Sequence, residues 1–497
     1  MRGAKNLIAQ THKRKRNIKQ KTAWKKQCSV SRNHIFASRK PEADILHELE
    51  KEKVGDDSAE GFSLKASAPS NSHGVQPLGN LYFTPSSHNS RNSGLGTHLG
   101  VLSTVSKSLY VFCNHEPLWR NIVLETCKGG FLFYETWKST YVSAIRPSFE
   151  ILNSGLNVRD FYSDYLFQSW LCANLEMKPE WLERDNIVRA KGISVEEFVS
   201  RFEEPNKPVL LEGCLENWAA LDKWDRNYLI ELCGNVQFSV GPVEMKLEEY
   251  FRYSDLAKEE RPLYLFDPRF ARKVPNLGLD YEVPVYFSED LFSVLGDERP
   301  DYRWIIIGPA GSGSSFHIDP NSTSAWNAVI KGSKKWILFP PDVVPPGVHP
   351  SPDGVEVACP VSIIEWFMNF YNETRSWKKK PIECVCKAGE VIFVPNGWWH
   401  LVINLEDSIA ITQNFVSRRN LLNVLDFLKK PNACMIVSGT RDRVNLYEKF
   451  KKAIEASFPG IVDDLLSKAE DKKIQKKKLS FWESVTDSNA GAFKFSF

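Results

Sequence analysis

The sequence has no long apolar run and little cysteine. None of its hydrophobic stretches approaches the roughly 18 residues that a membrane-spanning helix needs, and the basic N-terminus is not followed by the apolar core of a secretory signal. Ten cysteines are scattered along 497 residues, which is too sparse for a disulfide scaffold and indicates a reducing compartment. Cys384 and Cys386 have no second pair to complete a metal site, so we expect both thiols to be buried and structural. We therefore expect neither a membrane protein nor a secreted one.

Net charge is also small, but it is unevenly distributed. The formal charge is +3, whereas residues 1–26 carry ten Lys or Arg and no acid, and residues 472–478 carry five lysines in seven positions. Such basic blocks are typical of nuclear-import signals or nucleic-acid contacts, and equally of solvated, disordered arms. We expect a nuclear protein that can contact nucleic acid through its basic ends.

Composition and periodicity divide the chain into five expected segments. A basic, mostly disordered arm comes first, followed by a helical segment, a helical lead-in, a main domain rich in strands, and C-terminal helices with a Lys-rich tail. The expected boundaries are residues 1–95, 96–150, 151–186, 187–420 and 421–497.

The main domain has the pattern of short strands joined by tight turns. Apolar runs bounded by Gly, Pro and Asn occur at residues 208–213, 236–240, 302–308, 335–339, 390–395, 398–405 and 408–415. This spacing is typical of an all-β barrel or a double-sheet jelly roll. Asn396-Gly397 between two of the runs predicts a hairpin turn. We expect a mainly β fold with helical additions at both ends.

Helical periodicity precedes the main domain. Apolar residues recur at intervals of three and four at Leu99, Leu102, Val105, Leu109 and Phe112. Together with Leu118-Trp119, this pattern resembles the second half of an F-box, a module that binds the adaptor of a ubiquitin ligase. The first half, a Leu- and Pro-rich helix, has no counterpart upstream. A working F-box and a plain helical spacer are the alternatives, and we favour a truncated remnant that does not bind the adaptor.

Three residues carry the candidate chemistry. His317 and Asp319 stand two positions apart after a Gly- and Ser-rich turn, and His400 lies far downstream in another predicted strand. Residues i and i+2 of a strand face the same side, so His317 and Asp319 can both point into a barrel. Two histidines and a carboxylate can bind one face of an iron ion and leave the other face open, as in non-haem Fe(II) oxygenases. A lone histidine in a strand is more often structural, but the three residues together favour a metal site.

The sequence around these residues resembles the JmjC domain. The matching motifs are Phe316-His317-Ile318-Asp319-Pro320, Thr323-Ser324-Ala325-Trp326-Asn327, Lys334-Lys335-Trp336 and Gly397-Trp398-Trp399-His400. The resemblance covers residues 185–420 closely and is nearest to the branch of bifunctional arginine demethylases and lysyl hydroxylases. It implies a double-stranded β-helix (cupin or jelly-roll) core, Fe(II) and 2-oxoglutarate as cofactors, and O₂ as cosubstrate. His317, Asp319 and His400 are then the catalytic metal ligands.

The same resemblance implies which residues hold 2-oxoglutarate. These are Lys334, Thr412, Tyr264, Asn327, Ser314 and Asn414. The lysine ammonium and the Thr and Tyr hydroxyls serve the carboxylate that is remote from the metal, and the first asparagine serves the metal-bound end. The last two residues match further wall positions. Without the resemblance, Lys334 would be interpreted as a solvated surface lysine.

The reaction implied is the oxidative decarboxylation of 2-oxoglutarate, coupled to hydroxylation of a positioned C–H bond. On a lysyl side chain the product is a stable alcohol, whereas on an N-methyl group of arginine it breaks down to formaldehyde, which is net demethylation. The three metal ligands alone do not choose between these outcomes. The substrate expected is a protein with Arg or Lys side chains, histone tails included. Acidic residues predicted at the rim for such a substrate are Asp267, Glu289, Asp290 and Glu365.

Two other functions compete with this hypothesis. The first is a ubiquitin-ligase substrate receptor that uses the F-box-like segment, which the missing first half disfavours. The second is a catalytically silent cupin that binds peptides or RNA, which the intact His317, Asp319 and His400 disfavour. The family also implies a homodimer through the helices after residue 420.

Overall fold

A computed structural model describes residues 92–147, 158–471 and 474. The predicted basic arm up to residue 91 and the Lys-rich tail lie outside these residues, so the predictions made for them remain predictions. No helix within the described ranges is long and apolar enough to cross a membrane.

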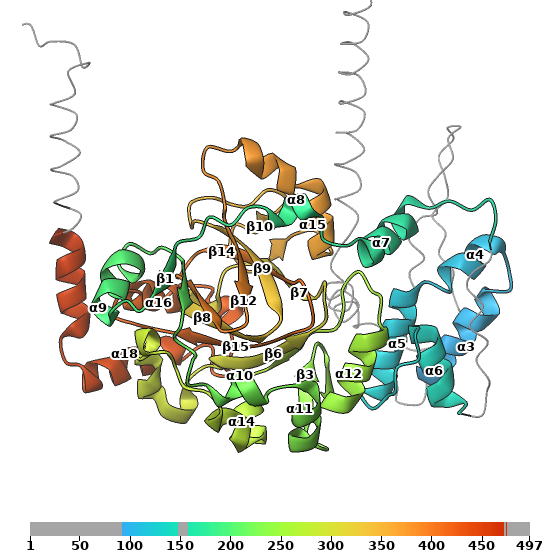
Figure 1. Cartoon of the computed structure of the whole chain (residues 1–497), viewed down its shortest axis with the longest axis horizontal. Helices are drawn as coiled ribbons and strands as arrows, with labels where there is room; N and C mark the ends of the chain where they lie inside the picture. The colour runs from blue at the N-terminus through green and yellow to red at the C-terminus, as the bar shows by residue number, and fades with distance from the viewer. Residues whose placement is uncertain (1–91, 148–157, 472–473, 475–497) are drawn as a thin grey trace, which may run out of the picture. The chain divides into compact units, whose positions relative to one another are not determined.

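Two β-sheets form the centre of the chain (Figure 1). The larger sheet has nine strands in the order β1-β2-β13-β8-β15-β6-β5-β3-β4, and the smaller has four in the order β12-β9-β14-β7. The larger sheet contains β1 Arg189–Lys191, β2 Val209–Glu212, β3 Gln237–Val240, β4 Val243–Lys246, β5 Leu265–Asp267, β6 Arg303–Gly308, β8 Ser324–Lys331, β13 Glu390–Val394 and β15 Ser408–Phe415. The smaller contains β7 Gly313–His317, β9 Ser333–Phe339, β12 Ile382–Lys387 and β14 Trp399–Asn404. A short pair, β10 His349–Pro350 and β11 Val357–Ala358, lies between β9 and β12 in the sequence.

Strands that follow one another in sequence alternate between the two sheets from β6 to β9 and again from β12 to β15. The link between β9 and β12 is the exception, because these two strands pair with each other in the smaller sheet. Alternation of this kind closes two antiparallel sheets face to face into a jelly roll. The predicted cupin-type core is therefore confirmed.

The predicted hairpin at Asn396-Gly397 is wrong. This turn joins β13 of the larger sheet to β14 of the smaller sheet, and the two strands do not pair with each other. Gly397 has a φ of +79°, so the Asn-Gly signal correctly marks a left-handed turn. The turn crosses from one sheet to the other because β14 pairs with β7 and β9 instead.

Helices cover the outer faces of both sheets. Figure 1 shows α10 Ala219–Lys223, α11 Arg226–Cys233, α12 Leu247–Leu256 and α14 Pro275–Leu279 below the larger sheet, and α8 Pro179–Leu182 and α15 Ile363–Asn369 above the smaller one. The remaining α-helices are α3 Asn92–Leu102, α4 Lys107–Phe112, α5 Glu116–Cys127, α6 Trp137–Ile145, α7 Asp164–Asn174, α9 Val195–Phe198, α13 Phe270–Lys273, α16 Leu421–Leu428, α17 Ala433–Ile436 and α18 Leu446–Ser457.

Strand alternation separates the interior of the barrel from the helix-covered faces. On β15, Ile409 and Ile411 belong to the core under the helices, whereas Thr412 and Asn414 occupy the opposite set of positions. The inner face carries a separate apolar cluster that includes Trp336, Leu338 and Val402, together with Cys384 and Cys386. Both thiols are buried and unpaired, as the sequence predicted, and they face the barrel interior.

The periodic apolar residues near the N-terminus form two helices instead of one. Ser106 is the N-cap of α4, because its hydroxyl accepts a hydrogen bond from the Leu109 N–H at 3.2 Å. The helix before it, α3, begins at Asn92, inside the segment expected to be a disordered arm. Apolar periodicity continues through the break, which explains why the sequence alone predicted one helix.

The F-box-like segment is packed into the core of the main domain. Trp119 is buried, and its indole N–H donates to the Cys113 carbonyl at 2.8 Å. Trp137 lies against Phe133 and against Tyr253 of α12, with ring centroids 5.0 and 5.6 Å apart. The helices α3, α5 and α6 therefore share one apolar core with the helices under the larger sheet.

Candidate metal and cosubstrate site

Two neighbouring strands of the smaller sheet bring His317 and His400 together. The two residues are directly paired between β7 and β14, and their imidazole centroids are 4.1 Å apart. Asp319 lies two residues beyond β7 in extended backbone, and its Oδ1 is 4.0 Å from His400 Nε2. One nitrogen or oxygen from each residue lies within 4.8 Å of the others. The three residues predicted from the sequence therefore converge on one point, although Asp319 lies beyond the end of β7 and not in the strand itself.

Hydrogen bonds hold both imidazole rings in the form that binds a metal. His317 Nδ1 lies 2.8 Å from the Ser315 carbonyl, and His400 Nδ1 lies 3.1 Å from the Trp398 carbonyl. A carbonyl only accepts, so each Nδ1 carries the proton and each Nε2 keeps a lone pair for a ligand bond. Burial holds the pKa of His400 well below its usual range, which keeps this ring neutral.

The Asp319 carboxylate is buried without a full set of partners. Burial raises its pKa to about 6, while His317 and a hydrogen bond from Asn414 act in the opposite direction. Its Oδ2 is buried and has no hydrogen-bond partner among the described residues. A buried, incompletely paired carboxylate beside two imidazoles fits a divalent cation, which would replace the missing counter-charge.

A β-bulge turns Ser314 toward the same side as the histidines. The pairing of β14 with β7 shifts between His400 and Val402, so that Val402 lies opposite Ser314. Directly opposed residues of an antiparallel pair point to the same face, and Val402 belongs to the interior cluster. The bulge thus places Ser314 inside the barrel and leaves Ser315 outside, where strict alternation would reverse them.

Lys334 lies buried in the barrel with two neutral partners. Its ammonium donates to Asn404 Oδ1 at 2.6 Å and lies 3.4 Å from the Tyr264 hydroxyl. Burial lowers the pKa of Lys334 to about 7. A buried lysine without a carboxylate partner fits a small anion, because a negative charge would restore its full protonation. The interpretation of Lys334 as a solvated surface lysine is wrong.

Thr412, Asn327 and Trp304 form one row across the larger sheet. Thr412 is paired with Asn327 of β8 on one side and with Trp304 of β6 on the other. The Asn327 side-chain oxygen is buried without a partner among the described residues. The Thr412 hydroxyl donates to the Trp326 carbonyl at 2.9 Å, so it must rotate before it can donate to a ligand. Asn414 lies two residues after Thr412 on β15, and its amide donates to the Thr323 hydroxyl at 2.7 Å.

Two residues of the site were not assigned a role from the sequence. Asn404 stands four residues after His400 on β14 and accepts from Lys334, and strand periodicity alone would have selected it. Trp336 stands two residues after Lys334, lies 5.9 Å from the His400 ring, and has a buried indole N–H without a partner among the described residues. Both could have been found by following the inner face of the ligand-bearing strands.

The acidic residues predicted at the rim are committed elsewhere. Asp267 is fully buried and accepts from Lys273 Nζ at 2.6 Å, and Glu365 is buried and accepts from Gln168 at 2.5 Å. The other two pair with arginines at 2.7 and 2.9 Å: Asp290 with Arg299 and Glu289 with Arg418. This prediction is wrong for Asp267 and Glu365, because each carboxylate is buried and bound by groups of its own chain.

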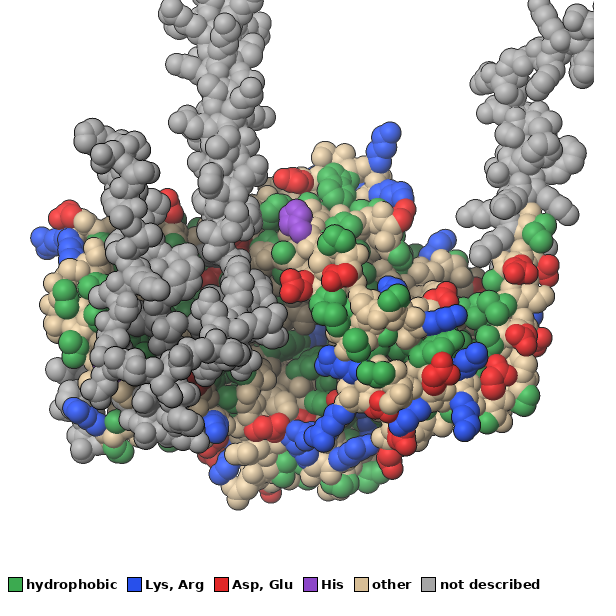
Figure 2. Space-filling model, turned by 180° about the vertical axis from the view of Figure 1, so that it is seen from behind, with side chains coloured by type: hydrophobic (Ala, Val, Ile, Leu, Met, Phe, Trp, Pro, Cys, Tyr) green, Lys and Arg blue, Asp and Glu red, His purple; other side chains and the backbone are tan. Residues whose placement is uncertain are grey.

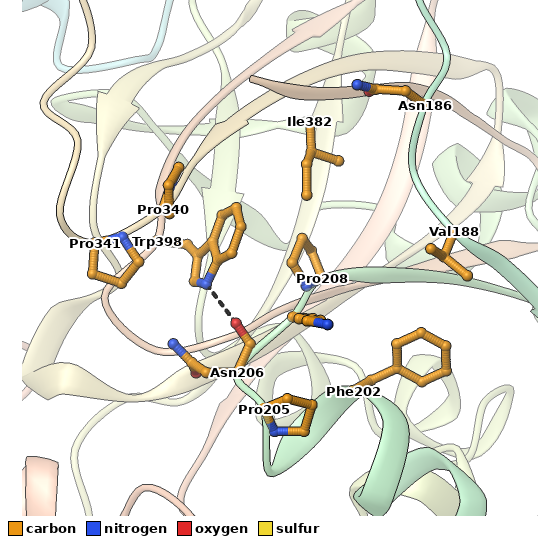
Figure 3. A pocket seen from close by; sticks show the side chains of 11 residues that line it. Asn186, Val188, Phe202, Pro205, Asn206, Pro208, Pro340, Pro341, Ile382 and Trp398 are labelled. Atoms are coloured by element: carbon orange, nitrogen blue, oxygen red, sulfur yellow. Dashed lines mark hydrogen bonds between the residues drawn. The ribbon is translucent and has the colours of Figure 1, made fainter. Parts of the chain in front are cut away.

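A cavity of about 450 Å³ lies beside the strand that carries His400 (Figure 3). Its wall is mostly apolar and includes four prolines, at positions 205, 208, 340 and 341. Trp398 lines it and donates from its indole N–H to the Asn206 carbonyl at 2.9 Å. None of the three candidate metal ligands lines this cavity, so it is distinct from the metal site.

Charge is mixed on the face that Figure 2 draws. Basic and acidic side chains lie interspersed over its described surface. The basic blocks from which nucleic-acid contact was predicted lie outside the described residues.

Comparison with known proteins agrees with the fold and the site. Residues 195–420 match the family model described as a cupin-like domain. The chain is 69% identical over 461 residues to the arginine-specific demethylase JMJ22 of Arabidopsis thaliana, an alignment that covers 88% of this chain and 91% of the relative.

Two more distant relatives are named for demethylase and hydroxylase activity or for oxygenase activity. The bifunctional arginine demethylase and lysyl-hydroxylase psr-1 of Caenorhabditis elegans is 44% identical over 257 residues, which cover 48% of this chain and 63% of that protein. The human 2-oxoglutarate and iron-dependent oxygenase JMJD4 is 30% identical over 305 residues, which cover 54% of this chain and 71% of the relative. The alignment with JMJ22 extends over most of both proteins, and the chain belongs to the cupin-like JmjC family.

Proposed function

We propose that this protein is a nuclear Fe(II)- and 2-oxoglutarate-dependent oxygenase that acts on arginine or lysine side chains of proteins. The observation that carries the proposal is the convergence of His317, Asp319 and His400, with ligand atoms within 4.8 Å of one another. The buried, anion-ready Lys334 on the same inner surface supports 2-oxoglutarate as the cosubstrate. The names of all three relatives above agree with this assignment.

The residues divide into two groups by the charge that they accept. His317, Asp319 and His400 would hold the iron through two neutral nitrogens and one carboxylate. Lys334, with Asn404 and Tyr264 beside it, would hold the remote carboxylate of 2-oxoglutarate. Iron and 2-oxoglutarate together with O₂ supply the oxidant that converts a substrate C–H bond into C–OH, with release of succinate and CO₂.

The remaining wall residues position the ligands and keep water out. Asn327 and Ser314 would add polar contacts, and both lie on the inner face. Asn414 lies close enough to the Asp319 carboxylate to lower its pKa, and its amide donates to the Thr323 hydroxyl at 2.7 Å. Trp336 and Leu338 give the barrel interior an apolar wall beside His400, which excludes bulk water and strengthens the electrostatic contacts there.

Methyl-arginine is the first substrate to examine, and unmodified lysine is the second. JMJ22 is named an arginine-specific demethylase, and psr-1 carries both activities in its name. Histone tails supply both side chains in the nucleus, to which the basic residues 1–26 would direct the protein.

Mass spectrometry of candidate peptides incubated with the enzyme, Fe(II) and 2-oxoglutarate tests this function. Loss of a methyl group identifies demethylation, and gain of one oxygen identifies hydroxylation. His317→Ala should abolish either product, whereas His349→Ala, at an exposed histidine of β10, should retain it. Product formation that survives His317→Ala would refute the assignment of the site.

The ubiquitin-ligase hypothesis has less support. The tryptophans of the F-box-like segment are buried against α12 and the core below it, which leaves them unavailable to an adaptor. Capture of the adaptor by the full chain in a pull-down would support the ubiquitin-ligase hypothesis. Dimerisation through the helices after residue 420 also remains a prediction, since α16 and α18 direct Leu421, Phe450 and Ile454 into a core of the same chain.

A further inference from the structure

Two aromatic residues, Phe266 of β5 and Tyr264 just before this strand, stand two positions apart in the sequence. Leu265 and Asp267 are buried on the opposite face, while Phe266 is 39% exposed. Tyr264, two residues before Phe266, reaches Lys334 with its hydroxyl. Because residues i and i+2 of a strand share a face, Phe266 stands roughly 7 Å along the strand from the residue that serves the cosubstrate.

Phe266 and Trp304 form an aromatic ledge. Their rings are stacked, with centroids 5.3 Å apart and planes at 24°. Trp304 is half-buried and lies directly opposite Thr412 on β15, which in turn lies opposite Asn327. The ledge therefore begins beside the row of residues assigned to 2-oxoglutarate and ends at the solvent-exposed edge of Phe266.

The four acids predicted to meet a cationic substrate are all bound by groups of their own chain. Asp267 lies on the buried face of β5 and binds Lys273, the Ser239 N–H and the Arg269 N–H. Glu365, Asp290 and Glu289 are likewise engaged by groups of their own chain. Aromatic faces attract cations without a carboxylate, and a planar guanidinium stacks on them better than a compact ammonium does.

We propose that Trp304 and Phe266 are specificity-determining residues, on which the guanidinium of a substrate arginine stacks while its methyl group reaches the metal site. This inference rests on the proposed oxygenase function and assigns the substrate-side contact of that site. Both rings act on the substrate through cation–π and stacking contacts, and neither contributes a ligand to the metal. The ledge thus favours an arginine over a lysine at the same position.

The test compares three peptides that differ in one side chain: methyl-arginine, lysine and citrulline, the neutral and nearly isosteric analogue of arginine. Peptide affinity is measured by fluorescence anisotropy, and KM and kcat by mass spectrometry. Phe266→Leu keeps an apolar side chain but removes the π face. The variant should raise the Kd and KM of the methyl-arginine peptide by about two- to fivefold. The Kd and KM of the citrulline peptide should change by less than about twofold.

Phe266→Tyr retains the π face and should therefore retain the preference for the methyl-arginine peptide over the citrulline peptide. Tyr110→Leu removes an aromatic ring of equal exposure, 39%, from α4 and serves as the matched control. If Phe266→Leu weakens the methyl-arginine and citrulline peptides equally, the ledge is overturned while the oxygenase function stands. If the wild-type protein modifies neither the methyl-arginine nor the lysine peptide, the proposed function itself fails, and the ledge with it.

Discussion

At the residue scale, two adjacent lysines have opposite roles because a strand directs them to opposite faces. Lys334 points into the barrel and has only neutral partners, whereas Lys335 points outward and pairs with Glu383 at 3.0 Å. Both side chains are buried. The same sequence, Lys-Lys, thus yields one ammonium poised for a ligand and one committed to the fold.

Lys334→Met should separate binding from stability. The variant removes a buried ammonium that burial penalises, so the free energy of unfolding without ligand should rise by roughly 1–3 kcal/mol at pH 7. We expect 2-oxoglutarate with a divalent metal to stabilise the wild-type protein against heat, and Lys334→Met should lose most of this stabilisation. Differential scanning fluorimetry with and without 2-oxoglutarate measures both effects. A variant that is still stabilised like the wild type would show that Lys334 does not hold the cosubstrate.

The same lysine predicts a pH dependence. Its pKa is about 7 in the folded protein, against a usual value of 10.5. Between these two pH values the unfolded chain binds more protons at this lysine than the folded chain does. The contribution of Lys334 to the stability of the ligand-free protein should therefore rise with pH through this window. Binding of a dianion needs the ammonium form, so the KM for 2-oxoglutarate should rise above pH 7, by up to about tenfold per pH unit.

Steady-state kinetics from pH 6.5 to about 8.5 check this pH dependence. A KM for 2-oxoglutarate that stays constant over this range would contradict the ionisation assigned to Lys334.

At the element scale, the close approach of β7 to β14 positions the metal ligands. Gly313 opens β7, and a Cβ at this position would come within 2.1 Å of the Val402 carbonyl oxygen. The backbone of β14 would have to move, and β14 carries His400 two residues before Val402. The bulge that turns Ser314 inward lies in the same pairing.

Gly313→Ala should therefore weaken metal binding as well as the fold. We expect a loss of about 1–3 kcal/mol in stability, since rigid backbone must shift to remove the overlap, and at least a tenfold weaker affinity for Mn(II). Gly100→Ala in α3 is the control, because a Cβ there meets no atom within 4 Å and alanine favours a helix. Isothermal titration with Mn(II) and thermal melts read the two effects. Unchanged Mn(II) affinity in Gly313→Ala would contradict the proposed link between this contact and the metal site.

The elements also show what the sequence could and could not predict. Strand periodicity with the short His-x-Asp spacing predicted the metal ligands, because residues two apart in a strand must share a face. The sequence failed for Asp267 and Glu365, which were proposed from residue type alone, because their contacts, such as that of Glu365 with Gln168 197 positions away, do not follow from it. It also misassigned the Asn396-Gly397 turn, because a turn signal fixes the local backbone and not the sheet to which the next strand belongs.

At the scale of the whole molecule, a buried ionic cluster joins four parts of the chain. Glu383 of β12 binds Lys335 of β9, Arg184 at 2.8 Å and the Tyr371 hydroxyl at 3.0 Å. Lys335 also donates to the Arg184 carbonyl at 2.7 Å. The cluster fastens the segment after α8 to the outer side of the smaller sheet, behind the strand that bears Lys334.

Lys335→Met should destabilise the protein by about 2–4 kcal/mol, because it leaves the buried Glu383 carboxylate with Arg184 as its remaining cation. Lys335→Met combined with Glu383→Gln should lose less than the sum of the single variants. Lys449→Met, at an exposed pair with Glu298, should leave the stability nearly unchanged. Chemical denaturation measures all four variants. Equal small effects at Lys335 and Lys449 would contradict a structural role for the cluster.

The central claim is that His317, Asp319 and His400 bind the iron of a 2-oxoglutarate-dependent oxygenase. Its most direct test is turnover of a methyl-arginine or lysine peptide under ¹⁸O₂ with mass spectrometry of the products. We expect one labelled oxygen in succinate and, on a lysine peptide, one in the hydroxylated product. Both signals should be lost in His317→Ala and retained in His349→Ala. Unlabelled succinate, or labelled succinate that persists in His317→Ala, would contradict it.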